Sequence, residues 1–160
     1  PTRRSSDLCC MTRATMRDID EMDFNIQVWD YMNWALGDRS LGFDRRLHWM
    51  GEPVSVTTLR NADKPLSEVL DEARTVAADN DMRVWVVVQH VTGMDVTGSL
   101  VLIPPEAWTR LSQLDTNREL DGIHFIQLAV GNGLGVVSLY QFALLMNHFQ
   151  PLGPDESKEV

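Results

Sequence analysis

The sequence predicts an α/β fold in a single domain, with a mixed β-sheet of about five or six strands and flanking helices. The run RVWVVVQH at 83–90 is rich in β-branched residues, which is typical of a strand buried on both faces in mid-sheet. The segment 66–79 is amphipathic, and its expected buried face consists of Leu66, Val69, Leu70, Ala73 and Val76. Short apolar runs bounded by turn residues supply the other strands.

The first elements are expected to be a helix and a hairpin. Apolar residues of 18–36 recur at helical spacing, acids crowd the start of the segment, and Gly37 ends the pattern. The segment FDRRLHWMGEPVSVTTLR at 43–60 predicts two extended strands around MGEP. The alternating apolar residues of these strands are Leu47, Trp49, Val54 and Val56.

The second half predicts a strand at 99–103, a helix at 104–114 that begins with two prolines, and a hairpin followed by a short helix or turn. The dipeptide Asn132-Gly133 is typical of a two-residue hairpin turn because both residues tolerate positive φ. The last element is expected around Gln141–Asn147, and the polar tail 151–160 is expected to be frayed.

The N-terminal residues do not resemble protein sequence. Back-translated, PTRRSSDL matches the end of a common short-read sequencing adapter, so we expect 1–10 to be an artefactual or disordered leader and 11–150 to form the domain. The true N-terminus is then not defined by the sequence. Cys9 and Cys10 are the two cysteines of the chain, so the domain itself offers neither a disulfide nor a thiolate ligand.

The charge and the missing motifs exclude several function classes. The formal net charge is -9, which disfavours a broad nucleic-acid footprint. The sequence contains no phosphate-binding P-loop, zincin helix, nucleophile elbow or EF-hand loop. No apolar run approaches the roughly 20 residues of a membrane helix. A cytoplasmic protein that does not bind a membrane is expected.

One family resemblance follows from the order of the elements. A hairpin is followed by VSVTTLRNADKPLSEVLDEA, the central strand RVWVVVQH, and GSLVLIPPEAWTRL. Over residues 42–112 this order resembles small phage and bacterial nucleases of the PD-(D/E)xK superfamily, which includes Holliday-junction-resolvase-like enzymes. The resemblance implies a restriction-endonuclease-like core, to which this chain adds a C-terminal hairpin.

The resemblance also implies positions for a catalytic site. The acidic residue of the family hairpin falls on Asp44, which becomes the expected magnesium ligand, and the E-x-K triplet falls on Thr58-Leu59-Arg60. Threonine supplies no anionic ligand, and arginine stays protonated and cannot act as a base. Asp44 and Arg60 are therefore the catalytic candidates of a degenerate site, and no cofactor is expected unless a magnesium ion binds.

The basic residues nearest these positions are candidates for nucleic-acid contacts: Arg45, Arg46, Arg60 and Lys64. The sequence leaves three functions open. The first is a catalytically degenerate nuclease-like domain that acts by binding, as a phage or mobile-element accessory protein. The second is a magnesium-dependent endonuclease that uses Asp44 with a displaced carboxylate, from Glu52 or from the acids of the first helix. The third is an acidic protein-binding or homo-oligomeric module whose C-terminal hairpin adds to a partner sheet.

Overall fold

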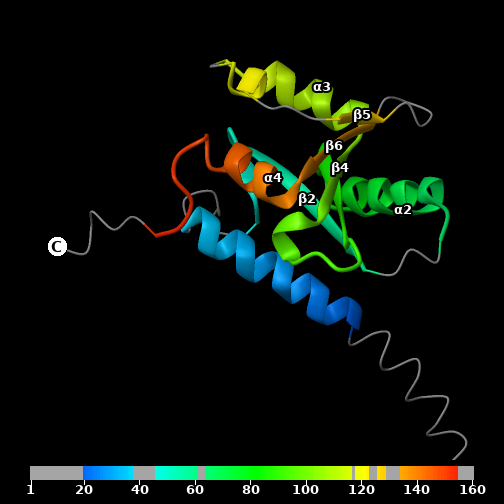
Figure 1. Cartoon of the computed structure of the whole chain (residues 1–160). Coiled ribbons are helices and arrows are strands. Elements are labelled where there is room, and N and C mark those ends of the chain that lie inside the picture. The colour runs from blue at the N-terminus through cyan, green and yellow to red at the C-terminus, as the bar shows by residue number, and fades with distance from the viewer. Residues whose placement is uncertain are drawn as a thin grey trace, which may run out of the picture.

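The protein is described here from a computed structural model, which places residues 20–37, 46–60, 64–116, 118–122, 126–128 and 134–154. These residues form one mixed sheet with helices packed on both faces (Figure 1). The predicted α/β class is thereby confirmed. Asp44, Arg45, the leader 1–10 and the turn residues Asn132 and Gly133 lie outside the described residues.

The described part of the sheet contains six strands in the spatial order β1-β2-β3-β4-β6-β5. Along the chain they are β1 (His48–Trp49), β2 (Glu52–Leu59), β3 (Val84–Gln89), β4 (Leu100–Ile103), β5 (Ile126–Leu128) and β6 (Leu134–Ser138). Strands β2 and β3 are parallel, and the other neighbouring pairs are antiparallel. The carboxyl ends of β2 and β3 therefore lie side by side.

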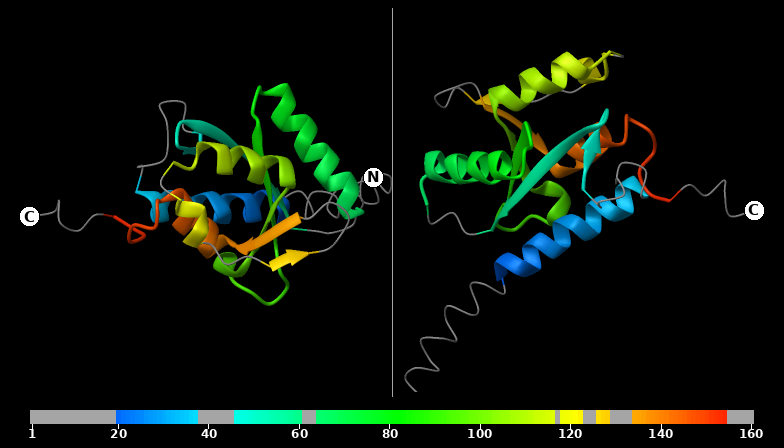
Figure 2. Two further views of the ribbon diagram at one scale, coloured as in Figure 1. Left: turned by 90° about the horizontal axis from the view of Figure 1, so that it is seen from above. Right: turned by 180° about the vertical axis from the view of Figure 1, so that it is seen from behind.

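The helices form two layers. Residues 20–36, called the N-terminal helix below, and α4 (Leu139–Met146) pack on one face of the sheet. Helix α2 (Leu66–Asp79) packs on the other face, and α3 (Pro105–Leu114) lies across one end (Figure 2). Two short 3-10 turns complete the described elements, η1 (Val96–Gly98) and η2 (Glu119–Gly122).

The hairpin of β1 and β2 turns at Met50-Gly51. Both residues have positive φ, 51° and 81°, as a two-residue primed turn requires. Glu52 and Pro53 already belong to β2, so the turn is shorter than the predicted MGEP segment. The hairpin buries Leu47 and Trp49 completely, as the alternating pattern predicts.

Strand β3 lies between β2 and β4, in the middle of the sheet as predicted. Its residues Val84, Val86 and Val88 pack towards the N-terminal helix and α4, while Trp85 and Val87 pack towards α2. All five are buried. A strand with covered faces on both sides gains from β-branched and aromatic residues at every position, which explains the continuous apolar run.

Helix α2 has the predicted bounds, but one residue that was predicted to lie on its buried face is exposed. The buried side chains are Val69, Ala73 and Ala77, whereas Val76 is 49% exposed. Residues four apart on a helix share one narrow stripe, and Val76 lies beside that stripe rather than on it. The apolar side chains Leu66 and Leu70 are partly buried at the margin.

The pairing of β5 with β6 confirms the predicted hairpin, in which Leu128 pairs with Leu134. Its predicted turn at Asn132-Gly133 lies outside the described residues. Packing of β6 against β4, from Leu100↔Ser138 to Ile103↔Gly135, fixes the position of β6 in the sheet independently of local turn propensity.

The residues at the start of the predicted tail contact the rest of the fold. The N–H of Gly153 donates a hydrogen bond to the carbonyl of Ala35, 2.9 Å away. The side-chain amide of Asn147 donates to the carbonyls of Gln150 and Pro151, at 3.0 and 3.1 Å. These contacts attach residues 150–154 to the C-terminal ends of α4 and the N-terminal helix.

Candidate functional site at the carboxyl ends of β2 and β3

The first polar site lies where the two parallel strands end. Thr58 pairs with Val88 and Leu59 with Gln89, and the N–H of His90 donates to the carbonyl of Leu59 at 2.9 Å. Ligands in open α/β sheets bind outside the carboxyl ends of strands. The Thr58-Leu59-Arg60 triplet that the resemblance singles out therefore occupies a position where sheets of this class bind ligands.

The N-terminal helix adds side chains to this site. The Thr58 hydroxyl donates a hydrogen bond to Oδ1 of Asn25, 3.0 Å away. The backbone N–H of Arg60 donates to Oε2 of Glu21, 2.9 Å away. Glu21 and Asn25 are four residues apart and so project from the same face of the helix. In Figure 1 the first turns of this helix lie beside the end of β2.

An aromatic contact anchors the same end of the helix. Phe24 is fully buried, and its ring meets the ring of His90 edge-on, with centroids 5.3 Å apart and planes at 80°. The imidazole of His90 is partly buried by this contact. Phe24 thus holds the helix against the end of β3 while Glu21 and Asn25 hold it against the end of β2.

The site contains one carboxylate among the described residues that meet there, that of Glu21. Magnesium is bound through carboxylate and other oxygen ligands, and its enzymatic sites use one or two carboxylates with substrate phosphates. Across the described part of the chain, no group of three or more His, Cys, Asp or Glu side chains is arranged to hold a metal ion. The other groups shown to meet there, the Thr58 hydroxyl, the Asn25 amide and the Arg60 backbone N–H, are suited to hydrogen bonding.

The structure separates the predicted basic contacts. Arg46 is exposed and precedes β1, beside the first half of β2, whereas Arg60 follows the last residue of that strand. Lys64 lies nearer to Arg60 in sequence, but its Nζ forms an ion pair with Glu72 at 2.9 Å, which raises the pKa of Lys64. Arg46 and Arg60 therefore belong to different ends of β2.

A second polar cluster lies at the opposite end of the sheet, and no sequence spacing indicates it. Nδ1 of His148 is 2.8 Å from Oε2 of Glu119, and the imidazole stacks on Trp49 with centroids 6.3 Å apart. The indole N–H of Trp49 donates to the carbonyl of Leu145 at 3.2 Å. These contacts join η2, the β1–β2 hairpin and the end of α4, so the cluster has a structural role.

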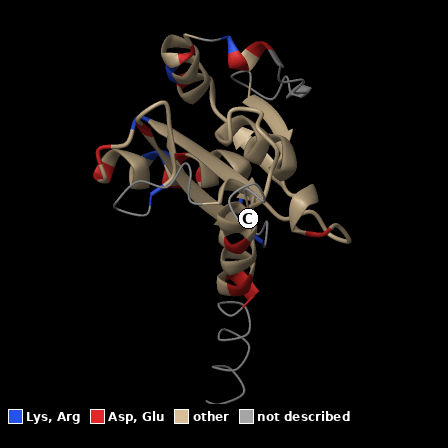
Figure 3. Cartoon of the chain, turned by 90° about the vertical axis from the view of Figure 1, so that its left-hand side faces the viewer, with Lys and Arg blue, Asp and Glu red and all other residues tan. Residues whose placement is uncertain are grey.

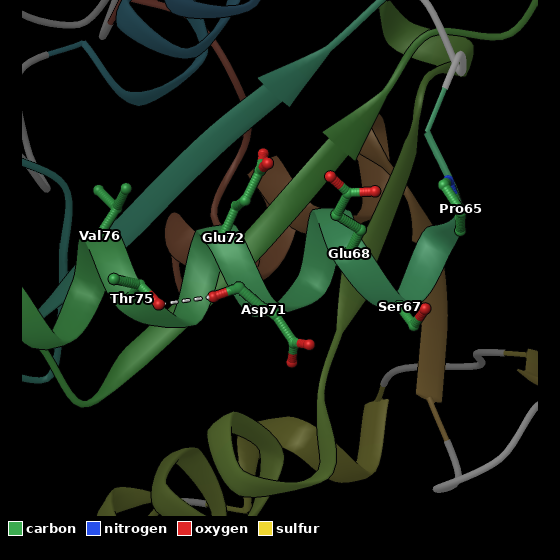
Figure 4. Close-up of a pocket in the computed structure, with 7 residues that line it drawn as sticks. All are labelled: Pro65, Ser67, Glu68, Asp71, Glu72, Thr75 and Val76. Carbon is green, nitrogen blue, oxygen red and sulfur yellow. Dashed lines mark hydrogen bonds between the residues drawn. The ribbon is translucent and has the colours of Figure 1, made fainter.

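A shallow hollow of about 670 Å³ lies along the outer face of α2 (Figure 4). Its lining comes from α2 and the residue before it: Pro65, Ser67, Glu68, Asp71, Glu72, Thr75 and Val76. In Figure 4 the side chains of Glu68 and Glu72 point to one side and those of Ser67 and Asp71 to the other. Because these polar groups diverge, they do not form a ligand site.

Comparisons with known proteins do not extend this description. The chain matches no protein-family model, and searches of curated proteins and of solved structures return no significant match. Within the described residues, none of the helices has both the length and the apolar character needed to cross a membrane.

Proposed function

We propose that this chain is a nuclease-like domain that binds a partner and does not cut nucleic acid. The hydrogen bond between Thr58 and Asn25 carries the proposal. The nuclease resemblance requires a metal-binding carboxylate at the position of Thr58, and here a neutral hydroxyl donates to a neutral amide. Neither group supplies the negative charge that a magnesium ion needs. The pair instead fixes the N-terminal helix to β2.

The charge distribution favours a protein as the partner. The net charge of -9 repels phosphate, and the described candidates Arg46 and Arg60 lie at different ends of β2. The ammonium group of Lys64 is paired with the carboxylate of Glu72. Phosphate binding needs several cations along one track, because each contact contributes separately to affinity.

A cleavage assay tests the absence of catalysis. The purified chain is incubated with supercoiled plasmid and with a four-way DNA junction in the presence of Mg²⁺, beside Asp44→Ala prepared identically. We expect no product from either protein. Cleavage by the wild type that disappears in Asp44→Ala overturns the proposal, whereas equal cleavage by both identifies a contaminating nuclease.

One observation favours the endonuclease as a second candidate. The carboxylate of Glu21, from the N-terminal helix, lies at the end of β2, within 2.9 Å of the Arg60 N–H. It is therefore the described carboxylate best placed to act as the displaced ligand. If cleavage occurs, Glu21→Gln must abolish it for this candidate to stand.

A DNA titration tests the choice of partner. Fluorescence anisotropy with labelled duplex and junction DNA is followed as the salt concentration rises. We expect weak binding with a slope of log affinity against log salt near zero, since few phosphates are neutralised. A steep negative slope that flattens in Arg60→Ala would instead identify a nucleic-acid-binding protein.

A further inference from the structure

A group of aromatic and thioether side chains lies exposed where three elements meet. Trp34 of the N-terminal helix is 53% exposed, Tyr140 of α4 is 50% exposed, and Met94 of the loop before η1 is 54% exposed. Tyr31, one turn before Trp34, is half-buried, and its ring centroid is 6.1 Å from that of Trp34. We call these four residues the aromatic surface.

Backbone contacts bring the three elements together. The N–H of Leu139, at the start of α4, donates to the carbonyl of Ser99, just after η1, at 2.8 Å. Residues of the N-terminal helix and of α4 together line one small cavity, so these two helices pack directly against each other. Burial first, and then the charges of Tyr140 and Asp95, raise the pKa of Tyr31. The aromatic surface is therefore continuous from the N-terminal helix to α4 and the η1 loop.

The chain itself occupies one side of Trp34. A Cβ at Gly153 would lie 3.1 Å from Cζ2 of the indole, so the glycine backbone rests directly on the ring. Gly153 stands in the sequence Pro151-Leu152-Gly153-Pro154, and its φ of +98° suits glycine. The indole thus already packs against a proline-flanked, non-helical segment, and about half of its surface stays open.

Among the described residues, the elements that carry the aromatic surface have charged side chains of one sign. The described residues 20–37, 91–98 and 138–154, which form these elements, contain no lysine or arginine. Their carboxylates are those of Asp20, Glu21, Asp23, Asp30 and Asp95. Figure 3 shows acidic residues along the N-terminal helix near its start. Asp30 is four residues before Trp34 and so adjoins it on the helix surface.

Asp95 contributes a carboxylate that is held in its charged form. The side-chain hydroxyl of Thr97 and then the backbone N–H of the same residue donate to Asp95, and these bonds lower the pKa of its carboxyl. A cation near Tyr31 would meet both this carboxylate and the aromatic ring faces. Cations bind over aromatic rings, and Coulomb attraction to the carboxylates adds to that effect.

We propose that the aromatic surface binds an extended, proline-containing basic peptide of another protein. Polyproline II segments dock onto exposed aromatic rings, and their rise of about 3.1 Å per residue makes two residues span the 6.1 Å between the Tyr31 and Trp34 rings. Arginine or lysine in the same peptide pairs with Asp30 and Asp95. The proposal deepens the proposed function by giving the partner's chemistry, and so rests on it.

Isothermal titration with synthetic peptides tests the proposal. The probe is a peptide of about twelve residues that repeats Arg-Pro-Leu-Pro, which favours polyproline II. One control replaces each Arg by Glu, and the other replaces each Pro by Ala. We expect the probe alone to bind measurably below about 1 mM, and its affinity to fall as salt rises from about 50 to about 300 mM. No binding of the probe, or equal binding of the controls, overturns the proposal.

Variants locate the site. Trp34→Ala and, separately, Tyr140→Ala should each weaken binding by about tenfold, a loss typical of a central aromatic contact. Ile26→Ala removes another exposed apolar residue of the same helix outside the aromatic surface and should change affinity less than about twofold. Circular dichroism checks that all three variants fold. Unchanged affinity in both aromatic variants contradicts the assignment.

Two further measurements test whether a second copy of the chain or a nucleic acid binds the aromatic surface instead. If the free protein sediments as a dimer that Tyr140→Ala dissociates, a second copy covers the surface, and the peptide proposal is wrong. If labelled DNA competes with the peptide, the surface binds nucleic acid, and the proposal is also wrong. Magnesium-dependent cleavage lost in Asp44→Ala would end the proposed absence of catalysis and leave the peptide affinities as measured, so the two failures are distinguishable.

Discussion

The hydroxyl of Thr58 and the side-chain amide of Asn25 are joined by a hydrogen bond of 3.0 Å, although 33 residues separate them in sequence. Thr58 lies near the carboxyl end of β2, and Asn25 lies on the N-terminal helix. The bond joins the N-terminal helix to β2 at the residue that the proposed nuclease resemblance aligns with a catalytic acid. That role can be measured as stability.

Thr58→Val should lower the free energy of unfolding by about 0.5–1.5 kcal/mol, because it removes the donor and keeps the β-branched shape. Asn25→Ala should cost a similar amount. If the pair interacts directly, the double variant should lose less than the sum of the single losses, with a coupling of about 0.5 kcal/mol or more. Urea denaturation measures all four proteins, and strictly additive losses would show that the bond contributes nothing.

Glu21 is the second helix residue that holds the end of β2. Its carboxylate accepts the N–H of Arg60, and a hydrogen bond to a charged acceptor contributes more than a neutral one. Glu21→Ala should therefore destabilise the fold by about 1–3 kcal/mol, and Glu21→Gln, which keeps an acceptor oxygen, by less. Thermal unfolding compares them. Equal losses in both variants would mean that the charge, and not the acceptor geometry, is responsible.

The sequence predicted correctly those elements that are encoded by a pattern of consecutive residues. The bounds of α2 and the two-sided burial of β3 agree with prediction, because amphipathic period and β-branched density are properties of consecutive residues. Val76 was assigned to the buried face and is exposed because it lies beside the stripe that Val69, Ala73 and Ala77 form. The turn at Asn132-Gly133 lies outside the described residues and stays a prediction.

The site depended on contacts that no spacing encodes. The acids of the first helix were candidates for a displaced carboxylate, but only the packing of Phe24 on His90 selects Glu21 among them. The cluster of Trp49, Glu119 and His148 joins segments from three parts of the chain. Residues of these types are common at the edge of any hydrophobic core, so they do not mark the cluster in the sequence. Asp44 was predicted from resemblance and stays a prediction.

A pair of serine substitutions compares a satisfied hydroxyl with an unsatisfied one. Ser99 is 0% exposed, and its hydroxyl has no hydrogen-bond partner in the described structure. Ser99→Ala should be neutral or stabilising by up to about 1 kcal/mol, since it removes a buried polar group that has no bond to lose. Chemical denaturation gives the value. Clear destabilisation would indicate that an ordered water binds Ser99 in solution.

Ser138→Ala is the matched control for Ser99→Ala. Ser138 caps α4: its hydroxyl accepts the N–H of Gln141 at 3.1 Å, and the side chain of Gln141 accepts the N–H of Ser138 at 3.2 Å. Removing such a cap costs about 1 kcal/mol. The two Ser→Ala changes should therefore differ by about 1–2 kcal/mol. Identical stabilities would contradict the capping role.

Tyr31 should titrate above its ordinary pKa of 10.0, because burial disfavours the phenolate and the charges of Tyr140 and Asp95 oppose it further. The chain has two tyrosines, so Tyr140→Phe leaves Tyr31 alone for a spectrophotometric phenolate titration. Adding Asp95→Asn should lower the midpoint without restoring 10.0, since burial remains. A midpoint at or below 10.0 in Tyr140→Phe would show that the phenol is open to water.

The raised pKa of Tyr31 also determines how the free energy of unfolding changes with pH. Because the folded pKa of Tyr31 is raised, its neutral form contributes stability that is complete below about pH 10 and declines as pH rises through the folded pKa. The unfolded chain loses this proton first, which favours unfolding. Wild-type protein should therefore lose more stability than Tyr31→Phe between about pH 9 and pH 11 in urea denaturation. A difference between the two proteins that stays constant over this range would contradict the raised pKa.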